Sequence, residues 1–369
     1  MKKIFVLPLL LFVCVIGNAQ KSSIPTPEML TNLFFFDINS GFIVADNILY
    51  YTDDGGDNWK KITDAPSEYD NPAMKTTSKG IFKLPYGNTI KDIFFLDKDT
   101  GWIAVSGMGG CVYRTVNGGK TWKPQAGYDN PKIAHHYYKT LYFIDNKIGF
   151  AGATNFTFEA TPIFDATADG GNKYVPISLE NKDINTMMSS GILKIYFSDA
   201  KTGWAVGSAG IIKSVDGGYT WYLDTTKIYE VDYAKAKKDQ SIEPVKRIPT
   251  FESIYFLDAD NGIAAAGYEI FITFSGGKSW YGWVDTNNVV GELTSAIMID
   301  DQTAIAAGGM YPIRIKNVPS SGFLIKTTDG GQNWSILEQS DYPFGPIQKL
   351  KEGQILIGGK NKILIYGEK

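Results

Sequence analysis

Cysteine and arginine are both scarce in this chain of 369 residues. The two cysteines are Cys14 and Cys111, and Cys14 lies in an N-terminal apolar segment. Cys111 therefore has no partner in the rest of the chain, which excludes a disulfide framework. Arginine occurs only at Arg114, Arg247 and Arg314, and the formal net charge is -3. Because the sequence has no cluster of basic residues, it does not indicate nucleic-acid binding.

Long apolar runs are absent after the first 19 residues. That segment, MKKIFVLPLLLFVCVIGNA, begins with lysines, continues through a short apolar run and ends with small residues. This arrangement predicts a secretory signal peptide over residues 1–19, whereas the run is too short to favour a membrane anchor. We therefore expect residues 20–369 to be secreted, to the periplasm or the exterior of a Gram-negative bacterium, and not to span a membrane.

One eight-residue phrase occurs six times along the chain. Its pattern is Ser/Thr-x-Asp-Gly-Gly-x-Thr/Ser/Asn-Trp, with substitutions at several positions. The copies are TDDGGDNW (52–59), TVNGGKTW (115–122), TADGGNKY (167–174), SVDGGYTW (214–221), TFSGGKSW (273–280) and TTDGGQNW (327–334). Self-similarity at intervals of several tens of residues is typical of solenoids and propellers.

A second repeated pattern precedes each phrase, as in IKDIFFLDKDTGWIAV (90–105) and LKIYFSDAKTGWAVG (193–207). Each unit reads as four short strands separated by turn residues. We therefore predict an all-β, seven-bladed propeller of four-stranded blades within residues 20–369, with the phrase as the turn between strands three and four in six blades. The seventh unit begins near Ile347 and stops after its third strand. A strand from around residues 24–30 is expected to close it, because closure leaves no unpaired edge.

Local turn chemistry accounts for every position of the phrase. Gly217 and Gly218 permit positive φ, Asp216 accepts hydrogen bonds within its own turn, and Trp221 buries a large ring. A catalytic group is usually needed once, whereas this phrase occurs six times and tolerates substitution. We assign structural roles to the third position, Asp54, Asn117, Asp169, Asp216, Ser275 and Asp329, and to the tryptophans Trp59, Trp122, Trp221, Trp280 and Trp334.

The phrase is similar to the Asp-box, or BNR repeat. The whole unit resembles the photosystem II stability and assembly factors and their bacterial relatives, with the best match at residues 192–221. The resemblance extends over about residues 31 to 367. It implies a seven-bladed propeller that binds a protein partner and has no catalytic activity. It does not itself identify a site, because one fold hosts many functions.

Strand alternation predicts which face would bind that partner. The links between strands 1 and 2 and between strands 3 and 4 of a blade (links 1–2 and 3–4) emerge on one face. The links between strands 2 and 3, and from strand 4 to strand 1 of the next blade (links 2–3 and 4–1), emerge on the other, and most of the long insertions are links of this second kind. We expect binding there, opposite the Asp-boxes, on tyrosine-rich loops suited to a peptide or a glycan; packing of the loops against the scaffold is the alternative role for these rings. The candidate residues are Tyr69, Tyr128, His135, His136, Tyr137, Tyr138, Tyr229, Tyr233, Arg247, Tyr311 and Arg314.

A carbohydrate-active protein, glycan-binding or hydrolytic, is the alternative. Arg247-Ile248-Pro249 matches the arginine motif of sialidases, but it follows the fourth box, whereas the family's motif precedes the boxes. Arg114 is expected on an outer strand, away from the axis. Glycoside hydrolysis stays open, because a pair of acids cannot be located from sequence. Adjacent histidines on a strand point to opposite faces, so no metal site and no cofactor is expected.

Overall fold

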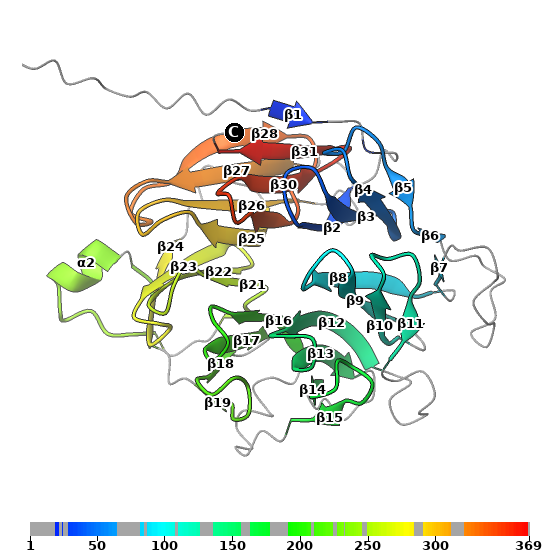
Figure 1. The fold of residues 1–369 in the computed structure, drawn as a ribbon. Helices are drawn as coiled ribbons and strands as arrows, with labels where there is room; N and C mark the ends of the chain where they lie inside the picture. Colours follow the sequence, from blue (N-terminus) through cyan, green and yellow to red (C-terminus); the bar gives the residue numbers. More distant parts are fainter. Residues whose placement is uncertain are drawn as a thin grey trace, which may run out of the picture.

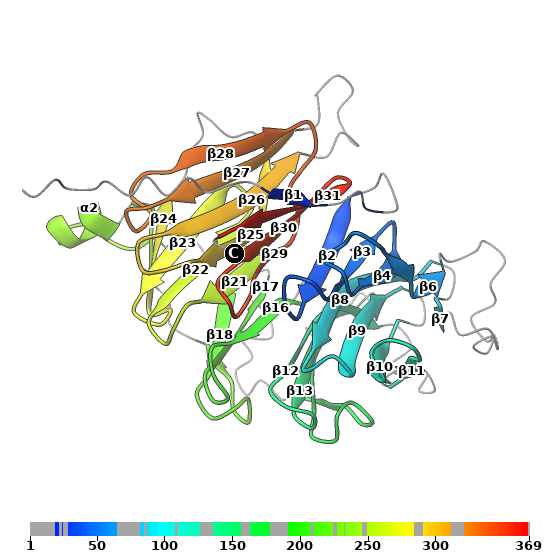
Figure 2. The same ribbon diagram turned by 45° about the horizontal axis from the view of Figure 1, so that its top comes forward.

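Seven β-sheets surround a common axis, with one strand of each sheet innermost (Figure 1). The tilted view in Figure 2 shows the same sheets side by side around the ring. The computed structural model describes residues 19–21, 24, 29–64, 82–84, 87–107, 110–125, 136–155, 163–177, 191–207, 210–223, 227–231, 233–245, 249–283, 291–310 and 321–367. The predicted all-β, seven-bladed propeller is confirmed. Within these residues no helix is long and apolar enough to cross a membrane.

The first four blades each contain four antiparallel strands, in chain order from the axis outward. Blade 1 comprises β2 (Leu30–Phe35), β3 (Gly41–Ala45), β4 (Ile48–Thr52) and β5 (Lys60–Lys61). Blade 2 comprises β8 (Thr89–Phe95), β9 (Thr100–Ser106), β10 (Val112–Val116) and β11 (Lys123–Pro124). Blade 3 comprises β12 (His136–Phe143), β13 (Gly149–Asn155), β14 (Ile163–Thr167) and β15 (Val175–Pro176). Blade 4 comprises β16 (Ile192–Phe197), β17 (Gly203–Gly207), β18 (Gly210–Ser214) and β19 (Tyr222–Leu223).

Blades 5 and 6 follow the same plan, with additions at the outer edge of blade 5. Blade 5 comprises β21 (Ser253–Phe256), β22 (Asn261–Ala266), β23 (Glu269–Phe274) and β24 (Ser279–Trp283). Blade 6 comprises β25 (Glu292–Met298), β26 (Ala304–Met310), β27 (Ser321–Thr327) and β28 (Ser335–Ser340). The short strand β20 (Lys227–Tyr229) pairs parallel to β24, and the helix α2 (Tyr233–Lys238) projects from the ring (Figure 1). A parallel pair, β6 (Thr63–Asp64) and β7 (Phe82–Lys83), lies beside blade 1.

Blade 7 combines the two ends of the chain. Its strands β29 (Ile347–Lys349), β30 (Ile355–Gly359) and β31 (Lys362–Tyr366) are C-terminal, and β1 (Ala19–Lys21) pairs antiparallel with β31 as the outermost strand. Closure near the termini is confirmed, but the closing strand precedes the predicted segment 24–30. Two prolines occupy that segment, and proline has no backbone N–H to donate to a strand partner.

A single side chain joins the inner strands of blades 7 and 1. The Phe35 N–H donates to Gln348 Oε1 at 2.7 Å, and Gln348 Nε2 donates to the Phe35 carbonyl at 2.8 Å. Because the side-chain amide has both N–H donors and a carbonyl acceptor, it bonds the N–H and the carbonyl of Phe35 as a neighbouring strand would. The ring is thus closed at its inner edge by Gln348 and at its outer edge by β1.

The hydrophobic core is divided among the interfaces between blades. Seven clusters of buried residues each draw their members from two adjacent blades, so every blade is held by both of its neighbours. In four successive interfaces an aromatic ring on strand two stacks on the phenylalanine that ends strand one of the next blade. The centroid distances are 4.4 Å for Phe42–Phe95, 3.6 Å for Trp102–Phe143, 5.3 Å for Phe150–Phe197 and 3.6 Å for Trp204–Phe256.

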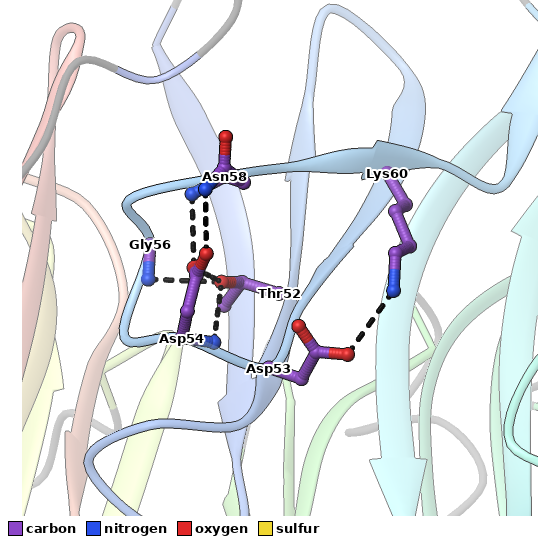
Figure 3. A network of polar contacts seen from close by, with 6 residues as sticks. All are labelled: Thr52, Asp53, Asp54, Gly56, Asn58 and Lys60. Carbon is purple, nitrogen blue, oxygen red and sulfur yellow. Dashed lines mark hydrogen bonds and ion pairs between the residues drawn. The ribbon is translucent and has the colours of Figure 1, made fainter.

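The six Asp-boxes repeat one pattern of hydrogen bonds, which Figure 3 shows for the first box. The Gly56 N–H donates to Thr52 Oγ1 at 2.9 Å, and Thr52 Oγ1 donates to Asp54 Oδ1 at 2.8 Å. Asp54 Oδ1 also accepts from the Asn58 N–H at 2.9 Å. The bond from the second glycine to the first-position hydroxyl recurs at 2.8–3.0 Å in the other five boxes. Six Asp-box turns are therefore present, as predicted.

The substituted boxes keep their bonds because the replacements also offer an oxygen. Asn117 Oδ1 accepts from the Thr121 N–H at 2.9 Å, and Ser275 Oγ accepts from the Ser279 N–H at 3.0 Å. The more buried group in each box is the first-position hydroxyl, which is no more than 4% exposed in any of the six boxes. In contrast, the sequence directs attention to the aspartate, which is less buried.

The Asp-boxes and the strand 1–2 turns share one face of the ring. The first glycine of each box donates its N–H to a carbonyl in the strand 1–2 turn of the same blade, at 2.7–2.9 Å. An aspartate organises each of these turns, as when Asp199 Oδ1 accepts from the N–H groups of Lys201 and Thr202. We name this side the box face, and the opposite side, where links 2–3 and 4–1 emerge, the loop face.

The buried hydroxyl and the aspartate of box four should contribute unequally to stability. Ser214→Ala removes the acceptor for the buried Gly218 N–H and should lower the free energy of unfolding by about 1–3 kcal/mol. Asp216→Asn should cost less than about 1 kcal/mol, because Asn117 makes the corresponding bonds in box two. Urea denaturation of both variants measures the difference. A larger loss for Asp216→Asn than for Ser214→Ala would contradict this assignment.

Acid should weaken the turns of the box face. Hydrogen bonds from the Asn58 backbone and side chain lower the pKa of Asp54 from 3.8 to about 2. Because the folded-state pKa lies below the ordinary value, the stabilisation is complete above that value and is lost as pH falls from 3.8 to about 2. The melting temperature should fall across this window, and Asp54→Asn should make the fall shallower. An unchanged slope in the variant would refute the role of this carboxylate.

Candidate functional site

A cavity of about 820 Å³ lies on the axis of the ring. Residues of all seven innermost strands, β2, β8, β12, β16, β21, β25 and β29, line it. Because each of these strands runs from a 4–1 link to a strand 1–2 turn, its first residues lie toward the loop face and its last toward the box face. The cavity has the size of a small-molecule or peptide-segment pocket.

A β-bulge at the start of the inner strands supplies part of the lining. In five blades one residue of the inner strand has no partner on strand two, and each such residue lines the cavity. These residues are Thr31, Lys91, Lys139, Leu193 and Thr294. Bulges re-aim side chains and are frequent beside functional sites. The loop-face end of the cavity is therefore lined by side chains that are free to differ among blades.

An arc of aromatic rings lines the cavity closer to the box face. The rings lie three residues before the turn aspartate in blades 1 to 5, and neighbouring centroids are 4.9–6.3 Å apart. They are Phe34, Phe94, Tyr142, Tyr196 and Tyr255. The Tyr142 and Tyr196 hydroxyls donate to the carbonyls of Phe197 and Phe256 in the following blades, at 3.1 and 2.7 Å. The arc is thus held in place, and its residues are half-buried in the wall of the cavity.

Asp92 joins three blades at the wall of the cavity. Its carboxylate accepts from Thr140 Oγ1 at 3.0 Å and from the Leu141 N–H at 3.1 Å, both in blade 3. Lys194 of blade 4 forms an ion pair with the same carboxylate at 3.3 Å. Because these partners neutralise and bond Asp92, this acid is structural, and Lys194 is the paired lysine of the cavity.

Lys91 and Lys139 differ from Lys194 because neither has a side-chain hydrogen bond or an ion pair within the described residues. Lys91 and Lys139 are the bulge residues of neighbouring inner strands and line the same cavity. Burial, followed by the positive charge of Lys139, lowers the pKa of Lys91. On blade 5, Glu252 also lines the cavity, and burial and the charge of Glu292 raise its pKa. The loop-face end thus has a positive side on blades 2 and 3 and an acid on blade 5.

Among the described residues, the predicted candidates Tyr137, Tyr138 and Tyr229 do not line this cavity. Tyr138 was expected on the loop face, but its ring is 0% exposed in the core between blades 2 and 3. Its hydroxyl donates to Asp165 Oδ2 at 3.2 Å, so the expected binding role is wrong for this residue. Tyr229 stacks on Tyr281 at 5.2 Å on the outer edge of blade 5, and Tyr137 lies half-buried on β12. His136 begins β12 and Tyr233 begins α2. Tyr69, Tyr128, His135, Arg247, Tyr311 and Arg314 lie outside the described residues.

Arg114 has a structural position, on the outer strand where it was expected. On β10 its guanidinium lies 5.3 Å from the ring centroid of Trp102. Lys213, which also directly precedes a box, lies 5.0 Å from the Trp204 centroid and donates to the Gly276 carbonyl at 2.8 Å. A cation in this place packs on a ring of its own blade and reaches the next box. Arg114 is therefore not placed to join a three-arginine carboxylate clamp.

The described residues contain no group of three or more His, Cys, Asp or Glu side chains that could hold a metal ion. Cys111 is buried, and burial raises the pKa of its thiol to about 12. A thiol with that pKa stays protonated at neutral pH and is a poor nucleophile. Cys111 therefore acts as a small core residue.

Sequence reasoning missed the cavity residues, although a signal for them exists. In blades 1 to 6 the inner strand is followed by a repeated aspartate: Asp37, Asp97, Asp145, Asp199, Asp258 and Asp300. Counting back from it, the sixth, fifth and third residues supply most of the lining. The sixth position reads Thr, Lys, Lys, Leu, Glu, Thr along the chain and the fifth reads Asn, Asp, Thr, Lys, Ser, Ser, so both vary in charge and polarity within an otherwise regular pattern.

Comparison with known proteins places the chain among Asp-box propellers. Residues 50–61 match the family model of the BNR/Asp-box repeat. Over 193 residues the chain is 26% identical to the chloroplastic photosystem II stability/assembly factor HCF136 of Cyanidioschyzon merolae (strain NIES-3377 / 10D). That match covers 49% of this chain and 40% of the relative, so it spans less than half of the relative's length.

Two solved structures share the fold over nearly the whole chain. YCF48 from Cyanidioschyzon merolae has a TM-score of 0.60 and 16% identity, covering 95% of this chain and 98% of that one. YCF48 bound to D1 peptide has a TM-score of 0.59 and 16% identity, covering 94% and 96%. The chain is an Asp-box repeat β-propeller similar to the photosystem II stability and assembly factors.

Removing the Asp92 carboxylate should destabilise the wall between blades 2, 3 and 4. Asp92→Ala leaves the Leu141 N–H without its acceptor and Lys194 without its counter-ion, so we expect a loss of about 2–4 kcal/mol. The estimate is below that for a fully buried pair because Lys194 is 41% exposed. Urea denaturation measures the loss, with Glu252→Gln as the control at the same cavity. Equal losses in both variants would contradict a structural role specific to Asp92.

Proposed function

We propose that this chain is a secreted, non-catalytic propeller that binds a peptide segment of a protein partner through its loop face. The observation that carries the proposal is a fold shared along 94% of the chain with YCF48 bound to D1 peptide, combined with an axial cavity that has polar groups left to bind. A peptide in an extended conformation fits such a cavity because it presents side chains and backbone groups at regular intervals.

The chemistry of the two faces supports the loop face as the binding side. On the box face, the box hydroxyls, the carboxylates and the glycine N–H groups already bond one another or the strand 1–2 turns. At the loop-face end of the cavity, Lys91 and Lys139 have no bonding partner within the described residues. A ligand gains most from groups that have not been satisfied by the protein itself.

Export to the envelope is part of the same proposal. Cleavage after Ala19 would leave Gln20 and Lys21 to pair with Leu364 and Ile363 in the closing strand. The signal peptide would then end at the point where the propeller begins, which is compatible with folding after translocation. An envelope location agrees with an assembly or quality-control role for a protein that holds a partner without changing it.

A carbohydrate-active function is the second candidate, supported by one observation. Glu252 lines the cavity, and burial and the charge of Glu292 raise its pKa, as is typical of a carboxylic acid that donates a proton. Two acids with different environments are the minimum that glycoside hydrolysis requires. The peptide-binding proposal is favoured because the nearby lysines and the aromatic arc can contact a peptide without a catalytic pair of acids.

Site-specific photocrosslinking can test which face binds. A peptide selected from a phage-displayed library would be labelled and mixed with protein carrying p-benzoylphenylalanine at Thr31, an exposed residue of the cavity, or at Tyr219, a box residue that is 79% exposed. We expect crosslinks from position 31 and none from position 219, because the two positions lie at opposite faces. The unlabelled peptide should suppress the crosslink.

Three outcomes would overturn the proposal. Crosslinking only from position 219 would place binding on the box face. A library that gives no binder in repeated selections would remove the peptide as ligand. Hydrolysis of fluorogenic glycosides that is lost in Glu252→Gln would establish the enzymatic alternative, because that change removes the acid and preserves the shape of the side chain.

A further inference from the structure

The inner strands of blades 2 and 3 each carry a lysine and an aromatic ring in the same cavity. On β8 these are Lys91 and Phe94, and on β12 they are Lys139 and Tyr142. The spacing is three residues in both strands, which corresponds to about 10 Å along an extended chain. The Phe94 and Tyr142 rings are 4.9 Å apart, so the two strands present matching pairs side by side.

The charges of the cavity favour an anion beside the two lysines. Five lysines and two carboxylates line it, although the chain as a whole has a net charge of -3. Lys194 is paired with Asp92, and Lys349 donates to the Ile299 carbonyl at 2.7 Å. A concave surface with walls of low dielectric constant concentrates the field of the remaining positive charges. An anion between Lys91 and Lys139 would relieve the repulsion between their ammonium groups.

The other groups that face this position restrict where the anion can lie. Glu252, on blade 5, repels a second negative charge and so disfavours binding at that side of the cavity. Asp92 is bonded to Thr140 and to the Leu141 and Ile93 N–H groups, and its charge is offset by Lys194. Blades 2 and 3 are therefore the side on which a carboxylate would be attracted.

We propose that the axial cavity binds an amphipathic carboxylate, with the carboxylate held between the Nζ atoms of Lys91 and Lys139 and an aromatic or aliphatic group packed on Phe94 and Tyr142. The two groups of the ligand are expected about 10 Å apart, which is the rise of three residues along the strand from each lysine to its ring. Such chemistry occurs in a free aryl or fatty acid, and also in a peptide whose acidic and aromatic side chains are three residues apart. The free-acid case does not depend on the proposed peptide-binding function.

Isothermal titration calorimetry on the full chain can test this with 6-phenylhexanoate, which has both groups at a suitable separation. Benzoate and hexanoate each lack one requirement, and 6-phenylhexan-1-ol lacks only the charge. The variants are Lys91→Gln and Lys139→Gln. Lys351→Gln is the matched control, because Lys351 lines the same cavity from the turn at its box-face end. A blocked Asp-Ala-Ala-Phe peptide supplies the peptide form of the ligand.

We expect 6-phenylhexanoate to bind more tightly than the three partial ligands and to lose affinity at high salt. Lys91→Gln and Lys139→Gln should each weaken binding about tenfold or more, since each removes a bond to a charged group, whereas Lys351→Gln should change it little. Binding of the blocked peptide alone, or of the free acid alone, identifies the source of the carboxylate and supports the site in either case.

Equal binding of 6-phenylhexan-1-ol would overturn the proposal. Equal losses of affinity in Lys351→Gln and in the variants Lys91→Gln and Lys139→Gln, at unchanged melting temperature, would also overturn it. Failure of both the free acid and the blocked peptide to bind would also overturn it. None of these results decides the crosslinking experiment, in which a selected peptide of another composition can still bind at the loop face. The two proposals therefore fail separately.

Discussion

The hydrogen bond from the second glycine of each Asp-box to a buried hydroxyl is the interaction on which the ring depends. It folds the box tightly enough for that glycine to lie against the preceding blade, as Gly218 lies against the Phe150 ring. A side chain at this glycine would collide with the ring, and its φ of 84° also favours glycine. The box therefore fastens strands three and four and, through the same atoms, holds one blade against the next.

This arrangement separates the constrained part of each repeat from the part that can vary. On the box face, a change in one residue disturbs bonds within the turn, the strand 1–2 link and the neighbouring blade. At the bulge of the inner strand, the side chain lines the cavity and has no partner residue on strand two. The repeat can therefore carry Thr31, Lys91 or Leu193 at one equivalent position without loss of the fold. Binding specificity belongs where packing places the fewest demands.

Much of the fold could be predicted because its determinants are local. Turn residues such as Gly217 and Gly218, and aromatic runs that end in aspartate, identify strands and turns without any long-range information. The closing strand could not be placed, since residues 19–21 carry no pattern and pair only because β31 offers a free edge. Tyr138 was misplaced for a similar reason. Its burial against blade 2 depends on where two blades meet, and a tyrosine in sequence looks alike on a surface and in a core.

The cavity shows why a candidate site can lie outside the repeated motif and still be located by its fixed distance from that motif in the sequence. No residue of the lining forms a recognisable signature, because the seven inner strands are separated by tens of residues and meet only when the ring closes. Closure by Gln348 and β1 brings the first inner strand beside the last, and the lysines of blades 2 and 3 then line one cavity with Glu252 of blade 5. Each ammonium group alone would be an ordinary solvated charge. In one cavity their charges add, and this is the physical basis on which the proposed carboxylate would be selected.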